Sequence, residues 1–104
     1  MTERLIDLLR ARYAARKRRV EFLGREVFVS PLTVQEQMRI AKMHPDDDAL
    51  RMVEMVIAKA VDADGKPVFT LDDKQELKRG IAMDDIMPLV AAINGPSPEE
   101  QEKN

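Results

Sequence analysis

The chain has 104 residues, of which 44% are hydrophobic and only 4% aromatic, and it contains no cysteine. This composition excludes disulfides and thiolate metal sites, and it favours helices packed through aliphatic and methionine side chains over a β-sandwich. The net charge of −2 is unevenly distributed: residues 1–25 hold eight Lys or Arg against three acidic residues, and residues 26–104 hold nine against sixteen. The basic end could pair with the acidic body, with another copy or with a separate partner.

The N-terminal segment, residues 1–17, is predicted to form an amphipathic helix. Leu5, Leu8 and Leu9 recur on one side at helical spacing. Thr2 could cap this helix. Charges interrupt its apolar residues, and no apolar run in the chain approaches the roughly 20 residues that span a bilayer, so neither a secretory signal nor a membrane helix is expected.

A β-hairpin is predicted next, over residues 20–29, because two short apolar runs flank Gly24-Arg25. Glycine at the first central position indicates a two-residue turn of type II′. Pro31 is expected to end the second strand.

Four further helices are predicted in the rest of the chain. Their approximate ranges are 34–43, 47–61, 71–79 and 86–93. Thr33 and Glu36 have the spacing of a capping box, which fixes the start of the first of these helices. Pro88 is tolerated only in a first helical turn, so the last helix is expected to be capped by Asp85.

These elements predict a mainly α, α+β fold: a single small helical domain over residues 1–95, with about five helices and one N-terminal hairpin. Residues 96–104 are polar and acidic and include Pro96 and Pro98. They are predicted to form a disordered tail.

The turn around Asp62, Asp64 and Gly65 superficially suggests a calcium-binding loop. With Gly65 at position 6 of an EF-hand loop, however, positions 1 and 12 are Ala60 and Leu71, which supply no side-chain ligand. No metal site is therefore expected there. A plain connecting turn explains the same residues.

Catalytic residues are not evident in the sequence. The single histidine, His44, precedes a proline at a predicted helix end, where a turn role is favoured. Acidic pairs such as Asp84-Asp85 stand at helix starts, where the helix dipole favours them on structural grounds. The sequence predicts no enzyme, no catalytic residue and no cofactor.

A basic cluster extends from Arg10 to Arg19. It could follow a phosphate backbone, which would make the chain a small nucleic-acid-binding regulator. The acidic body and the absence of an evident helix-turn-helix or aromatic platform disfavour nucleic acid. A protein-binding arm is the preferred interpretation, with Arg12, Arg16 and Arg19 as its candidate contact residues.

Six internal methionines fall in or beside the predicted helices. Methionine suits adaptable apolar surfaces, but it also fills cores that lack aromatic residues. Because Leu50, Val53 and Ile57 already form a core stripe on the 47–61 helix, the methionines flanking this stripe are expected to be exposed. The candidates for partner contact are Met52, Met55 and Met87.

Four features follow one another along the chain. They are the segment 27–36 that leads into a capped helix, a D-x-D-G-x-x-x-F-x-x-x-D pattern over 62–73, the Ala-Ala-Ile-Asn-Gly helix end at 91–95, and the short acidic tail closing on Lys103-Asn104. In order and spacing, these features together resemble the tail assembly chaperones of long-tailed bacteriophages, and the resemblance covers about residues 18–104.

This resemblance implies a non-enzymatic role in the cytoplasm of a host bacterium. Such proteins coat the tape measure protein before tail tube subunits polymerise around it, and they are absent from the finished virion. The implied partners are the tape measure protein, and beyond it the tail tube protein and other copies of the chain. A head–tail connector protein, which would remain in the virion, is a further alternative.

Overall fold

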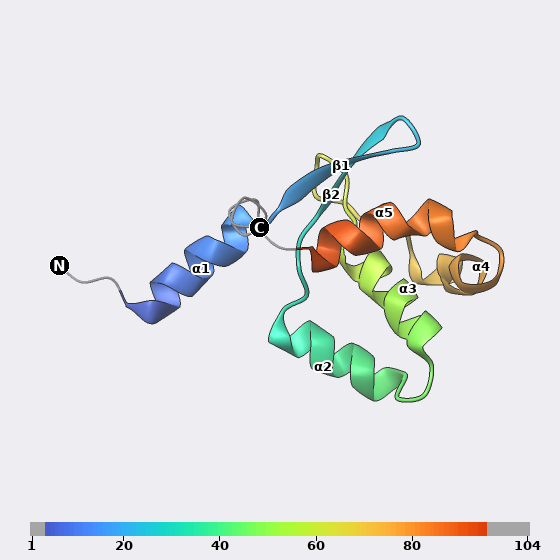
Figure 1. Ribbon diagram of the computed structural model, residues 1–104, viewed down its shortest axis with the longest axis horizontal. Helices are drawn as coiled ribbons and strands as arrows, with labels where there is room; N and C mark the ends of the chain where they lie inside the picture. The colour runs from blue at the N-terminus through green and yellow to red at the C-terminus, as the bar shows by residue number, and fades with distance from the viewer. Residues whose placement is uncertain (1–3, 96–104) are drawn as a thin grey trace.

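The computed structural model describes residues 4–95 and shows an α+β fold of five α-helices and one two-stranded antiparallel hairpin (Figure 1). The predicted fold class is confirmed. In chain order the elements are α1 Leu5–Ala15, β1 Arg18–Phe22, β2 Arg25–Val29, α2 Val34–Met43, α3 Asp48–Lys59, the 3-10 turn η1 Leu71–Asp73, α4 Lys74–Arg79 and α5 Met83–Asn94. The predicted cap Thr2 and the predicted tail 96–104 lie outside the described residues.

The hairpin is two residues longer at its start than predicted, and its turn is different. Arg18 pairs with Val29 and Phe22 with Arg25, which leaves Leu23 and Gly24 as the turn. Both have positive φ, 52° and 79°, as in a type I′ turn. The predicted type II′ turn at Gly24-Arg25 was wrong, because in the observed register Arg25 is the first residue of β2 and Val27 pairs with Val20.

A third extended segment joins the open edge of the hairpin. Phe28 and Val61 exchange both backbone hydrogen bonds, at 2.8 and 2.9 Å, and Val61 also forms a bridge with Pro67. This pairing ends α3 at Lys59, two residues earlier than predicted, because Val61 cannot be both helical and paired with β2. It also places the segment 67–69 beside the hairpin.

Side-chain caps are present at three helix starts, one of which is the predicted capping box. At α2, Glu36 N–H donates to Thr33 Oγ1 at 3.2 Å and Thr33 N–H donates to Glu36 Oε1 at 2.9 Å, so the capping box is confirmed. At α3, Asp47 Oδ1 accepts from Leu50 N–H at 3.0 Å. Thr70 N–H donates to Asp73 Oδ2 at 2.9 Å where η1 begins. These bonds satisfy backbone donors that a helix start leaves unpaired.

The start of α5 differs from the prediction. The helix begins at Met83 with Ala82 as its N-cap, so Asp85 lies within the first turn and Pro88 lies inside the helix. Pro88 lacks the N–H that would bond the carbonyl of Asp84. The buried face of α5 and the acidic first turn stabilise the helix despite this missing bond.

The core lies between the hairpin, α3 and α5, and α2 closes it from the side of α3 (Figure 1). Its buried side chains are aliphatic or methionine, as the composition predicted; they are Val27, Val29, Ile40, Val53, Met55, Val56, Ala60, Ile86, Leu89, Val90 and Ile93. None of them comes from α1, which extends away from this body (Figure 1).

Candidate partner-binding surfaces

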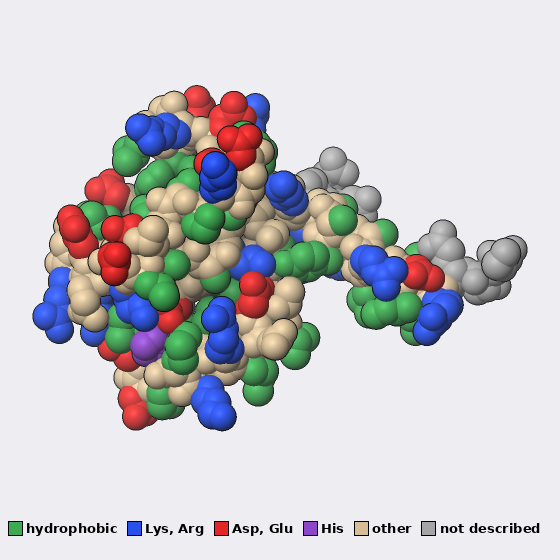
Figure 2. Space-filling model, turned by 180° about the vertical axis from the view of Figure 1, so that it is seen from behind, with side chains coloured by type: hydrophobic (Ala, Val, Ile, Leu, Met, Phe, Trp, Pro, Cys, Tyr) green, Lys and Arg blue, Asp and Glu red, His purple; other side chains and the backbone are tan. Residues whose placement is uncertain are grey.

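Helix α1 exposes an apolar side. It spans Leu5–Ala15 and has no buried residue. Its large hydrophobic side chains are exposed; they are Leu5, Ile6, Leu8, Leu9 and Tyr13. Figure 2 shows hydrophobic side chains along the projecting helix with Lys and Arg beside them. A surface of this composition is available for contact with another protein.

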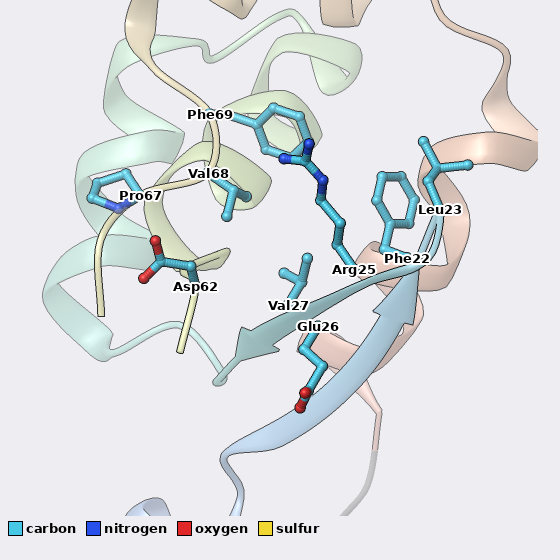
Figure 3. Close-up of a pocket in the computed structure, with 9 residues that line it drawn as sticks. All are labelled: Phe22, Leu23, Arg25, Glu26, Val27, Asp62, Pro67, Val68 and Phe69. Carbon is cyan, nitrogen blue, oxygen red and sulfur yellow. The ribbon is translucent and has the colours of Figure 1, made fainter. Parts of the chain in front are cut away.

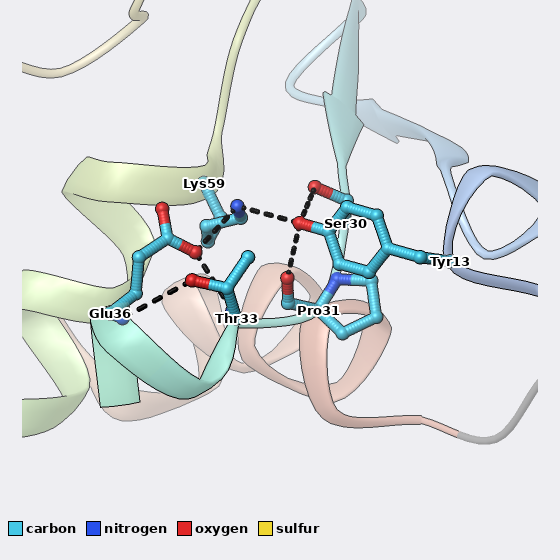
Figure 4. Close-up of polar contacts among 6 residues, drawn as sticks. All are labelled: Tyr13, Ser30, Pro31, Thr33, Glu36 and Lys59. Atoms are coloured by element: carbon cyan, nitrogen blue, oxygen red, sulfur yellow. Dashed lines mark hydrogen bonds and ion pairs between the residues drawn. The ribbon is translucent and has the colours of Figure 1, made fainter. Parts of the chain in front are cut away.

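Tyr13 attaches the C-terminal end of α1 to the body (Figure 4). Its hydroxyl donates to the carbonyl of Pro31 at 2.9 Å and lies 3.5 Å from Ser30 Oγ. The ammonium of Lys59, from α3, donates to the same hydroxyl at 3.0 Å and to Glu36 Oε1 at 2.9 Å. One network therefore links α1 with the start of α2 and the end of α3.

The charges of this network stabilise one another. Burial raises the pKa of Glu36, but hydrogen bonds from the Thr33 backbone and from Lys59 outweigh it and leave the pKa below its usual value. Burial likewise lowers the pKa of Lys59, and its contacts with Tyr13 and Glu36 outweigh that effect and leave the pKa raised. Both side chains are therefore charged at neutral pH.

The arginines that follow α1 make contacts within the chain. Arg16 Nη2 donates to the carbonyl of Gly95 at 3.1 Å, directly after the C-terminus of α5. A cation is favourable there because the last carbonyls of a helix are unpaired. Arg19 forms an exposed ion pair with Glu26 on the neighbouring strand, at 3.3 Å. Arg12 is exposed in the last turn of α1. Partner contact by Arg12, Arg16 and Arg19 stays a prediction.

The methionines of α3 differ from expectation. Met55 is 6% exposed and belongs to the core, so its predicted exposure was wrong. The helix buries the face of Met55 and Val56, while Leu50 and Ile57 of the predicted core stripe are only half-buried. The reason is that α3 has apolar residues on two sides, and packing with α5 selects between them.

Met52 and Met55 nevertheless line the same surface hollow. The hollow has a volume of about 290 Å³ and lies between α2, α3 and α5. Met52 is half-buried and packs against the core. Met87 lies elsewhere on α5 and is 38% exposed. The structure therefore brings two of the three candidate methionines together and leaves the third apart.

A larger hollow lies beside the hairpin turn, where no site residue was predicted (Figure 3). It has a volume of about 600 Å³. The lining comes from β1, β2, the turn between them and the segment 62–69; it comprises Phe22, Leu23, Arg25, Glu26, Val27, Asp62, Pro67, Val68 and Phe69. An apolar turn residue, Leu23, was the one local signal of this surface, since turns normally carry polar side chains or glycine.

The acidic turn and the buried histidine have structural roles. Asp62 Oδ1 accepts from the N–H groups of Asp64 and Lys66 at 2.8 and 3.0 Å, and thereby holds the turn. His44 Nε2 lies 3.5 Å from the buried carboxylate of Glu54, which also pairs with Lys74 at 3.2 Å. Within residues 4–95, no three His, Cys, Asp or Glu side chains cluster in a way that could hold a metal ion.

None of the helices described is long and apolar enough to cross a membrane. The surfaces above are open, apolar and bordered by charges. Their chemistry suits contact with another polypeptide.

Comparison with known proteins finds similarity among solved structures. No protein-family model and no curated protein matches the sequence. Among solved structures, the tail assembly chaperone of bacteriophage HK97 is similar, with a TM-score of 0.56 and 16% sequence identity. The similarity covers 88% of this chain and 97% of that chain. The chain therefore shares its fold with a phage tail assembly chaperone.

Proposed function

We propose that the chain is a phage tail assembly chaperone that binds the tape measure protein and promotes assembly of the tail tube around it. It would act in the cytoplasm of the host bacterium and be absent from the mature virion. The observation that supports this proposal is the shared fold with the HK97 tail assembly chaperone, which extends over nearly the full length of both chains.

The surface between α2, α3 and α5 fits such a partner. A tape measure protein is long and helical, and helices bind to grooves through apolar side chains at helical spacing. Five aliphatic or methionine side chains line the hollow beside Met52, together with Gln37, Arg51 and Asn94. Methionine adapts its shape to different apolar groups. One flexible site could then accept many successive segments of one long helix.

A nucleic-acid-binding role has less support. Its basis was the basic cluster, yet Arg16 bonds the end of α5 and Arg19 pairs with Glu26. These contacts join the end of α1 to the end of α5, and the two strands of the hairpin to each other.

Co-expression with the tape measure protein of the same genome tests the proposal. We expect the tape measure protein to be insoluble alone, and soluble and co-purifying when the chain is present. Met52→Glu should reduce the recovery of soluble tape measure protein, because it places a charge in the hollow. Met83→Glu is the matched control, since Met83 is exposed in the acidic first turn of α5, away from the hollow.

A tape measure protein that stays insoluble or fails to co-purify would refute the proposed activity. Circular dichroism of each purified variant shows whether it is folded. If folded Met52→Glu protein solubilises the partner as well as the wild type does, the hollow is not the binding site.

A further inference from the structure

Two arginine side chains from the junction of α1 and β1 lie at the end of α5. Arg16 is the C-cap of α1, and Arg18 is the first residue of β1. Along β1, Arg18, Val20 and Phe22 are partly buried and alternate with exposed residues, so Arg18 lies on the face towards the body. Arg16 Nη2 donates to the carbonyl of Gly95 at 3.1 Å, and Arg18 Nη1 lies 3.5 Å from the position that a Cβ atom of residue 95 would take. Both guanidinium groups therefore meet at the residue that follows α5 (Figure 1).

Each of these guanidinium groups has a buried nitrogen with no hydrogen-bond partner among residues 4–95. The two atoms are Arg16 Nε and Arg18 Nη2. A buried donor that stays unpaired is costly, above all on a charged group, so these atoms indicate an acceptor outside the described residues. The intervening Lys17 has a different contact, since its ammonium lies 5.4 Å from the centre of the Phe28 ring. We name Arg16 and Arg18 the arginine pair.

The sequence that follows α5 supplies acceptors of the matching charge. Residues 96–104 contain Glu99, Glu100 and Glu102 and only one lysine. An ionised carboxylate accepts hydrogen bonds from guanidinium groups, often two at once, and such bonds are stronger than those between neutral groups. Charge complementarity therefore favours these glutamates as the acceptors for the arginine pair.

The glutamates are within reach because the chain leaves α5 directly beside the arginine pair. Gly95 has an extended backbone, with φ of −68° and ψ of 158°, as is usual for a residue before proline. Glu99 follows Gly95 by four residues, which span at most roughly 13 Å of chain. A tether this short gives a local concentration in the millimolar range, so even weak ion pairs are populated.

We infer that the acidic tail, residues 96–104, folds back and binds the arginine pair through the carboxylates of Glu99 and Glu100. This contact covers the basic surface at the root of α1, so an acidic partner of that surface must first displace the tail. It is therefore an autoinhibitory contact within one chain, and it does not depend on a tape measure protein. It replaces the disorder that composition alone predicts for these residues.

Nuclear magnetic relaxation of the ¹⁵N-labelled full chain tests this inference. At low salt, the backbone order parameters of Glu99 and Glu100 should exceed about 0.6, since lower values mark a flexible backbone. Replacing Glu99, Glu100 and Glu102 together by Gln should lower them below about 0.6, and these residues follow the last helix described. Arg18→Gln should have the same effect. Arg25→Gln, at the other end of the hairpin, is the matched control and should leave the order parameters unchanged.

Inorganic phosphate distinguishes a covered arginine pair from an open anion site. The Nε–Hε resonances of Arg16 and Arg18 should shift at a several-fold lower phosphate concentration in the triple glutamine variant than in the wild type, because the tail no longer competes. Asp72→Asn, Glu76→Gln and Asp84→Asn together remove the same charge from exposed sites of the body and should leave the wild-type response unchanged. A tail that is flexible in the wild type at low salt, or equal phosphate affinity of the wild type and the triple glutamine variant, would overturn the inference.

Discussion

Leu23 occupies a backbone conformation that suits glycine or asparagine. Its φ of 52° lies in the left-handed region, which costs an ordinary residue roughly 1–2 kcal/mol. Neighbouring Gly24 adopts φ of 79° without this cost. The exposed leucine therefore reduces the stability of the hairpin. Its side chain lines the hollow beside the hairpin turn.

Replacing Leu23 by Asn should stabilise the chain by about 0.5–1 kcal/mol, because Asn-Gly is the favoured pair of a type I′ turn. Urea unfolding at low protein concentration measures the change. Leu23→Ala is the control, since alanine keeps the Cβ atom that causes the strain. Equal stability of the Asn and Ala variants would show that the strain is not significant.

The Glu36–Lys59 pair makes stability depend on pH in a defined direction. The folded pKa of Glu36 lies below its ordinary value of 4.5, so its contribution is present above that value and is lost as the pH falls through the folded pKa. The pKa of Lys59 lies above 10.5, so its contribution is present below that value and is lost as the pH rises through the folded pKa.

Glu36→Gln separates the charge from the cap, because glutamine can also close a capping box. We expect the variant to be less stable than the wild type by roughly 0.5–1 kcal/mol at about pH 7, the value of a partly exposed ion pair. This difference should be smaller at about pH 3, because the ionic contribution of Glu36 is lost as the pH falls through its folded pKa. Denaturant unfolding at both pH values measures it, and an equal difference at both would contradict the ionic contribution.

At the scale of elements, local chemistry was sufficient to predict most of the fold. The box of Thr33 and Glu36 was correctly placed because it depends on atoms within three residues. The predictions were wrong where contacts between residues far apart in the sequence determine the bounds of a helix. Val61 leaves α3 to pair with Phe28, and the buried face of α5 extends that helix past Pro88.

The candidate surfaces were less predictable for the same reason. Met55 and Met52 are three residues apart on one helix, and only the position of α5 decides that Met55 is buried. Glutamate at both positions would therefore unfold the chain instead of testing a surface, so Met52 alone is the useful site of substitution. The hollow beside the hairpin turn is lined by residues of β1, β2 and the segment 62–69, and no local sequence pattern connects these segments.

Tyr13 links α1 to the body. Tyr13→Phe removes the hydroxyl that bonds Pro31 and Lys59 and leaves the ring in place. Because α1 buries no residue, we expect its amides to exchange with solvent markedly faster, while those of α3 keep their protection. Hydrogen exchange read by NMR measures both helices in one sample. Unchanged protection of α1 would show that other contacts hold it.

For the whole molecule, the arrangement separates a body from a projecting helix. The body has one aliphatic core. Its surface carries the hollow beside Met52 and the hollow beside the hairpin turn. The basic helix α1 lies outside it, which explains how one small chain has both a basic and an acidic part. The proposed function assigns the hollow beside Met52 to the tape measure protein.

The most direct test of the proposed function is made in the phage that, on this proposal, encodes the chain. An early stop codon in its coding sequence should give lysates with filled heads and no tails in electron micrographs, and expression of the chain from a plasmid should restore the tails. Mass spectrometry of purified wild-type virions should not detect the chain. Normal tails in the mutant, or the chain as a stable virion component, would contradict its role as a tail assembly chaperone.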